Sequence, residues 1–154
     1  MKALIQLLFI SLLVFPLSIN SQTIIGGVSL PVKIASESGA LNLNGGGIRE
    51  KLWIDLYVGG LYLLKDGNLF GMEAPSAEAI INADEAMSIY IEIVSTLITS
   101  DKMIAAVDEG FVKSTKGNTT PFEKEIEAFK AAFSEPITKN DIYIITYEPK
   151  KGMV

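Results

Sequence analysis

The 154-residue chain contains no cysteine and no histidine. Without cysteine it can form no disulfide, offer no thiolate nucleophile and build no thiolate-bound zinc site. Without histidine it lacks the imidazole base on which Ser-His-Asp and Cys-His mechanisms depend. We therefore expect no metal site and no cofactor, and we assign no catalytic residue.

Positive charge is also scarce, and arginine is nearly absent. Thirteen lysines and arginines face 18 acidic residues, which gives a formal net charge of −5 at pH 7. This is the wrong sign for a protein held to phosphate backbones, so we expect no nucleic-acid partner. Arg49 is the only arginine, and all the other cationic side chains are lysines.

Only one long apolar run is present, and it lies at the start of the chain. Lys2 precedes the apolar segment Ala3–Leu17, and small polar residues follow at Ser18–Ser21. This pattern is typical of an export signal, and the run is shorter than the ~20 residues of a membrane-spanning helix. We expect residues 1–21 to be a signal peptide. Residues 22–154 would then form one domain without a stable membrane span, exported to the periplasm or secreted.

The remaining sequence alternates between strand and helix patterns. Strands are predicted in 23–30, 32–34, 40–43, 52–64, 87–94 and 141–147, from β-branched and apolar residues with a period of two. A short helix is expected after Ser76, and a longer one from Thr99 or Ser100. Thr120-Pro121-Phe122-Glu123 resembles a capping box for a third helix. The order predicts an α+β fold.

The aromatic stripe of the helical region is most simply part of the core, but it can also line an apolar cavity; it consists of Phe111, Phe122, Phe129 and Phe133.

The final residues, Tyr147–Gly152, read as a hairpin turn with no returning strand before Val154. We therefore expect a polypeptide whose C-terminal part is missing.

Gly45-Gly46-Gly47 lies close to Arg49, but the run lacks the Gly-Lys-Ser/Thr ending of a phosphate-binding loop. We interpret the three glycines as a turn before the long strand.

Arg49, Trp53, Asp55 and Tyr57 form the strongest candidate site. In one continuous strand they would share a face by parity. An arginine can bind a carboxylate through two parallel hydrogen bonds, and a phenol can donate a third. A surface ion pair of Arg49 with Asp55 or Glu50 is the simpler explanation. Eight residues of straight strand span about 27 Å, so a joint site of Arg49 and Tyr57 requires the chain to reverse, most plausibly around Glu50-Lys51.

Several segments resemble the chalcone isomerase-like family, and its exported bacterial branch in particular. The segments that carry the resemblance are Gly27–Pro31, Leu41–Lys51, Leu56–Leu63, Ala128–Phe133 and the Tyr147–Gly152 turn, and the resemblance as a whole covers nearly all of residues 22–154. The resemblance implies an antiparallel sheet packed against helices, with a ligand cleft between them. Arg49 matches the family's cleft arginine. Tyr57 stands where the plant isomerases have a catalytic threonine, and Thr99–Lys102 lacks the tyrosine that these enzymes carry there.

The resemblance also implies the most specific function. Fatty-acid-binding members of the family pair the arginine with a tyrosine on the long strand, as Arg49 and Tyr57 do here. We therefore expect a non-catalytic domain that binds a carboxylate-bearing amphiphile, with Arg49, Tyr57 and Trp53 as ligand-binding residues. One alternative is an isomerase or lyase acting on an α,β-unsaturated carbonyl, with Arg49 stabilising an enolate. A second is a structural or partner-binding periplasmic domain with a closed core.

Overall fold

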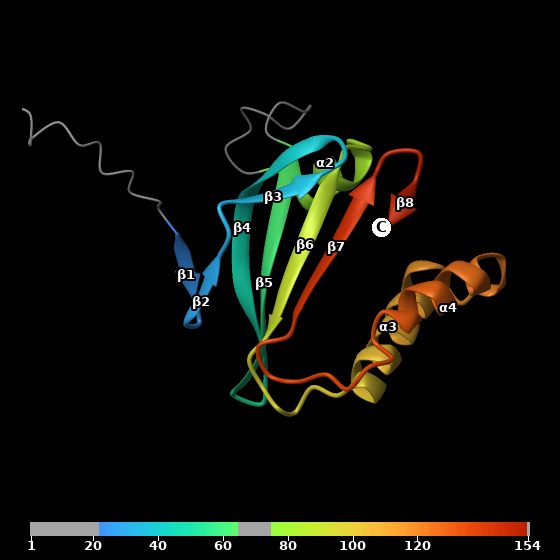
Figure 1. Ribbon diagram of the computed structural model, residues 1–154. Helices are drawn as coiled ribbons and strands as arrows, with labels where there is room; N and C mark the ends of the chain where they lie inside the picture. Colours follow the sequence, from blue (N-terminus) through green and yellow to red (C-terminus); the bar gives the residue numbers. More distant parts are fainter. Residues whose placement is uncertain (1–21, 65–74, 154) are drawn as a thin grey trace, which may run out of the picture.

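The computed structural model describes residues 22–64 and 75–153 (Figure 1). The expected signal peptide at 1–21 and the terminal Val154 lie outside the described residues. So does Lys65-Asp66-Gly67-Asn68, whose composition predicts a turn after the long strand.

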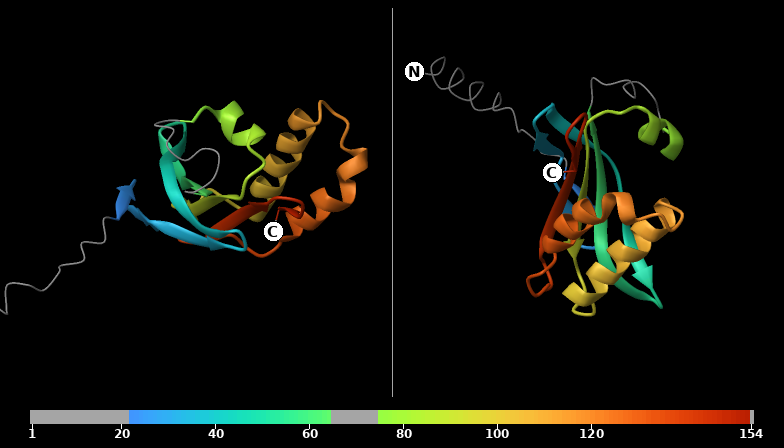
Figure 2. Two further views of the ribbon diagram at one scale, coloured as in Figure 1. Left: turned by 90° about the horizontal axis from the view of Figure 1, so that it is seen from above. Right: turned by 90° about the vertical axis from the view of Figure 1, so that its right-hand side faces the viewer.

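A six-stranded antiparallel sheet forms the centre of the molecule, and its strands follow one another in chain order. They are β3 (Lys33–Ser36), β4 (Gly39–Lys51), β5 (Ile54–Leu64), β6 (Met87–Ile93), β7 (Ile142–Glu148) and β8 (Gly152–Met153). The sheet is curled, and α3 (Ser100–Ser114) and α4 (Glu123–Ala131) pack on one of its faces (Figure 2). The short helix α2 (Ala77–Asn82) connects β5 to β6. This confirms the predicted α+β fold with an antiparallel sheet packed against helices.

Each face of the sheet has its own apolar core. On one face, Val58 and Tyr62 of β5 pack with Leu30 from a separate hairpin, formed by β1 (Thr23–Ile25) and β2 (Val28–Leu30). On the other face, Ile93 of β6 packs with Phe133 and with residues of α3 and α4. Successive residues of a strand point to opposite faces, so the alternation in β5 and β6 supplies both cores.

Several boundaries differ from the prediction because the chain turns where strand-forming residues are found. The expected strand over 23–30 is a hairpin that turns at Gly26-Gly27, where both φ angles are positive. The expected strand start at Leu52 is wrong, because Leu52 and Trp53 form the two-residue turn between β4 and β5. The chain does reverse between Arg49 and Tyr57, as the joint site requires, two residues later than Glu50-Lys51.

The glycine run is not the turn that we predicted. Gly45, Gly46 and Gly47 lie inside β4 and pair with Leu61, Gly60 and Gly59 of β5. Turn statistics favour loops for consecutive glycines, but here the small residues leave room on both faces of the sheet, as described below.

The longer helices match the sequence in one case and differ in the other. Thr99 caps α3, and its side-chain oxygen accepts a hydrogen bond from the Lys102 amide at 3.4 Å, which agrees with the predicted helix start at Thr99 or Ser100. The predicted capping box is wrong, because Thr120–Phe122 forms a 3-10 turn without a side-chain cap and α4 begins at Glu123. Among the described residues, no helix combines the length and the apolar character needed to cross a bilayer.

The chain also returns after its last turn, which the sequence did not lead us to expect. Gly152 and Met153 form β8, and they pair with Glu148 and Tyr147 of β7. The left-handed conformations of Lys150 and Gly152, with φ of 69° and 89°, allow the tight reversal.

The buried carboxylate of Glu148 links β7, near one edge of the curled sheet, to the β3–β4 turn at the opposite edge. Glu148 of β7 accepts hydrogen bonds from the Glu37 amide at 2.8 Å and from the Ser38 hydroxyl at 2.6 Å. Glu37 and Ser38 form the turn between β3 and β4, and Glu37 is also paired with Lys151. The hydrogen bond from the Ser38 side chain is the main reason why the pKa of Glu148 lies below its ordinary value of 4.5.

This carboxylate should make the fold acid-sensitive. A lowered native pKa contributes stability that is complete above the ordinary glutamate value and is lost as the pH falls through the native pKa. We expect the free energy of unfolding of the wild type, measured with urea, to fall as the pH is lowered through and below the ordinary glutamate value of 4.5. Glu148→Gln should be less stable at neutral pH and should lose less on acidification. Parallel pH curves for the two proteins would contradict this role for Glu148.

Candidate ligand-binding site

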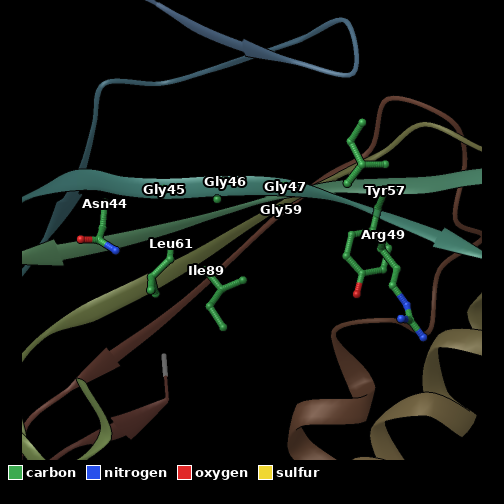
Figure 3. Close-up of a pocket in the computed structure, with 11 residues that line it drawn as sticks. Asn44, Gly45, Gly46, Gly47, Arg49, Tyr57, Gly59, Leu61 and Ile89 are labelled. Carbon is green, nitrogen blue, oxygen red and sulfur yellow. The ribbon is translucent and has the colours of Figure 1, made fainter. Parts of the chain in front are cut away.

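An open groove of about 530 Å³ lies on the helix-bearing side of the sheet, beside the region that α3 and α4 cover (Figure 3). Its volume is within the range of small-molecule binding pockets. Strands β4, β5 and β6 supply the lining, which is mostly apolar; the residues are Asn44–Arg49, Tyr57, Gly59, Gly60, Leu61 and Ile89.

The glycines of the two paired strands explain why a hollow exists here. A Cβ atom added to Gly45 or Gly47 would meet no atom within 4 Å, so these positions are open towards the groove. A Cβ atom added to Gly46 would lie 2.6 Å from Leu30 Cδ1 and 2.9 Å from the Gly59 carbonyl oxygen. The middle glycine therefore admits the β1–β2 hairpin on one face, while its two neighbours leave the opposite face without side chains.

Arg49 and Tyr57 lie side by side at one end of this groove (Figure 3). They are direct partners in the register of β4 and β5, and their side chains extend to the same side of the sheet (Figure 3). Residues opposite each other in an antiparallel pair have Cβ atoms about 5 Å apart, which allows two side chains to contact one small group. The hairpin therefore brings together the two residues that the sequence separates by eight positions.

Neither the Arg49 guanidinium nor the Tyr57 hydroxyl has a hydrogen-bond or ion-pair partner among the described residues. No ion pair between described residues includes Arg49, so the expected surface pair with Asp55 or Glu50 is absent there. The Tyr57 ring is half-buried and packs against the core of Ile93, Phe133 and Ile137. The ring is thus fixed by packing, while the guanidinium on the neighbouring strand is exposed.

Trp53 is not brought to the groove. It occupies the tip of the β4–β5 hairpin with φ of 64°, outside the residues that line the groove. The parity argument placed it beside Arg49 because it assumed one continuous strand. The turn at Leu52-Trp53 removes that assumption.

Sequence reasoning missed the apolar part of the groove. Leu61 and Ile89 are register partners on β5 and β6, and both line it. The period of two in residues 87–94 puts Ile89 and Ile91 on one face of the strand, and this was the available signal. What the sequence did not show is that glycines on β4 and β5 leave that face uncovered.

A second cleft of about 470 Å³ lies between α4 and the β7–β8 edge of the sheet. Phe129 and Phe133 line it and also pack edge to face, with ring centroids 5.5 Å apart. These two members of the aromatic stripe therefore serve both as core and as cavity wall. Phe122, which the same stripe included, is half-exposed and belongs to neither.

The arrangement as a whole defines a class of protein: a curled antiparallel sheet backed by helices, with an apolar groove that ends at a cation and a phenol. The chain belongs to the chalcone isomerase-like family, whose model matches residues 22–154. No curated protein matches the chain.

Solved structures show the same fold. One of them is a fatty-acid binding protein of Arabidopsis thaliana, with a TM-score of 0.59 and 24% sequence identity. The match covers 80% of this chain and 70% of the plant protein.

Proposed function

We propose that the groove binds an amphiphile with a carboxylate head, such as a fatty acid, and that it does so without catalysis. Arg49 holds the carboxylate, Tyr57 donates a hydrogen bond to it, and Leu61 and Ile89 contact the tail. One observation carries the proposal: Arg49 and Tyr57 are register partners at the end of an apolar groove.

The energies of head and tail are comparable. A hydrogen bond to a charged group contributes about 1.5–3 kcal/mol. Each fully buried methylene contributes about 0.8 kcal/mol, and a methylene in an open groove contributes less. A tail of several methylenes therefore matches the contribution of the head, and affinity should rise with chain length until the groove is filled.

Two further points support binding over catalysis. The Arabidopsis protein of the same fold is named a fatty-acid binding protein, which is consistent with an amphiphile as ligand here. The isomerase alternative calls for a tyrosine near the start of α3, and Thr99–Lys102 supplies none. We further propose that the protein acts in the periplasm or outside the cell, a proposal that depends on the sequence of residues 1–21 alone.

A titration with saturated fatty acids tests the proposal. Arg49→Ala should weaken binding by about 10-fold to 100-fold, because it removes the charged partner of the carboxylate. Lys51→Ala is the matched control, since it removes one positive charge from the same strand but lies outside the groove. Fatty alcohols of equal length should bind the wild type and Arg49→Ala alike. Equal affinity of the wild type and Arg49→Ala for fatty acids would refute the assigned head site.

A second variant tests the tail site independently. Gly47→Val places a branched side chain in the hollow, where an added Cβ meets nothing within 4 Å, so the fold should tolerate it. We expect long fatty acids to lose more affinity than short ones. An unchanged dependence on chain length would place the tail elsewhere.

A further inference from the structure

The tip of the β4–β5 hairpin is an apolar projection that the groove does not use. Leu52 and Trp53 are 73% and 89% exposed, and Ile54 beside them is exposed as well. We call these three residues the apolar tip. Burial in the core accounts for none of them, and Trp53 is the only tryptophan of the chain.

The backbone of this tip is unfavourable for the residues that occupy it. Leu52 and Trp53 have φ of 52° and 64°, the left-handed conformation of a two-residue turn in which both central residues have positive φ. Such turns strongly favour Asn-Gly or Gly-Gly, and bulky side chains with positive φ are outliers. Strain of this kind is concentrated where a side chain has a function beyond the fold.

The chemistry of the tip fits a lipid surface. Tryptophan has an apolar body and one N–H donor, and it is enriched where the acyl chains of a bilayer meet the headgroups. The formal charges next to the tip sum to zero, because Arg49 and Lys51 are positive and Glu50 and Asp55 are negative. A locally neutral, apolar projection on a protein of net charge −5 is suited to zwitterionic lipids, which neither repel it nor require a basic patch.

We propose that the apolar tip inserts into the headgroup region of a zwitterionic lipid bilayer and docks the protein there reversibly. Arg49 lies on the same hairpin, three residues or roughly 10 Å along the strand from Leu52 at the tip. Insertion would therefore hold one end of the groove close to the lipid surface. The docking itself depends only on the tip and does not require the groove to bind a fatty acid.

Vesicles of phosphatidylcholine test this directly, because Trp53 is an intrinsic reporter at the site itself. With residues 22–154, the domain that remains once the expected signal peptide is removed, the emission of Trp53 should shift to shorter wavelength on addition of vesicles, and lipids brominated on their acyl chains should quench it. Leu52→Ser/Ile54→Ser keeps the reporter and should lower the partition coefficient about tenfold or more. Ile81→Ser is the matched control, since Ile81 is 75% exposed on α2, away from the tip, and should bind vesicles like the wild type.

A second variant guards against misfolding as an explanation. Leu52→Asn/Trp53→Gly installs the preferred turn sequence and should fold at least as well as the wild type, yet lose sedimentation with vesicles. Binding of this variant at the wild-type level would overturn the proposal, as would an emission of Trp53 that vesicles leave unchanged. A spectral shift that appears without lipid and grows with protein concentration would assign the tip to a second copy of the chain, and would also overturn it. Fatty-acid titration without vesicles is unaffected by any of these outcomes.

Discussion

Gly46→Ala should destabilise the fold by about 1–3 kcal/mol, the usual cost of forcing extra atoms into a packed region. The added Cβ would lie 2.6 Å from Leu30 Cδ1 and 2.9 Å from Ile25 Cδ1. Both side chains can rotate, but the Gly59 carbonyl oxygen, also 2.9 Å away, belongs to the neighbouring strand and cannot. Either β4 and β5 separate locally or the β1–β2 hairpin lifts from the sheet. Urea denaturation measures the loss.

The next residue provides the control. Gly47→Ala adds the same methyl group to the same strand, but on the opposite face, where nothing lies within 4 Å. Alanine is favoured over glycine in a strand by about 0.5–1 kcal/mol, so this variant should equal or exceed the wild type in stability. Equal destabilisation by both substitutions would show that strand geometry, rather than the approach of β1–β2, requires glycine.

Phe133→Ala should have the largest effect on stability, about 3–5 kcal/mol, as for other buried aromatic residues. The side chain is 2% exposed. Its ring centroid lies 5.5 Å from that of Phe129 on α4 and 5.0 Å from that of Tyr143 on β7. It therefore joins the helical layer to the sheet, and its loss leaves a cavity between them. Thermal and urea denaturation measure the change.

Phe122→Ala is the matched control, because Phe122 is 49% exposed at the start of the same helical segment. We expect it to change stability by about 1 kcal/mol or less. Tyr57 packs against the core that contains Phe133. Phe133→Ala should therefore also lower the affinity for any ligand that contacts the Tyr57 hydroxyl. A small change in stability for Phe133→Ala would mean that the helices are held mainly by other contacts.

Much of the fold was accessible from the sequence because local signals agreed with the tertiary structure. The cap at Thr99 and the alternation of β6 are examples, and both are physical patterns that need no distant partner. The capping box at Thr120 failed, because the same residues also support a tight 3-10 turn. Such local competition between similar turns cannot be decided from residue types alone.

The candidate site could be predicted from the sequence only in part, because it depends on the exact position of a hairpin turn. Reasoning about reach required the chain to reverse between Arg49 and Tyr57, and it does. The position of the reversal could not be found, because Leu52 and Trp53 have the composition of a strand and yet form its turn. The glycine run failed for a related reason. Glycine is needed in this strand because Leu30 and Ile25, which belong to another hairpin, pack closely against Gly46.

The order of the strands has a consequence for how the protein folds. Each strand of the sheet pairs with its neighbours in the chain, so most of the pairing can proceed hairpin by hairpin at a small entropic cost of loop closure. The contact of Glu148 with the turn at Glu37 and Ser38 is different, because it joins residues 110 or more positions apart. It can form only after the intervening strands have curled. The hydrogen bonds of the Glu148 carboxylate to this turn therefore form late in folding, once the strands of the sheet have already paired.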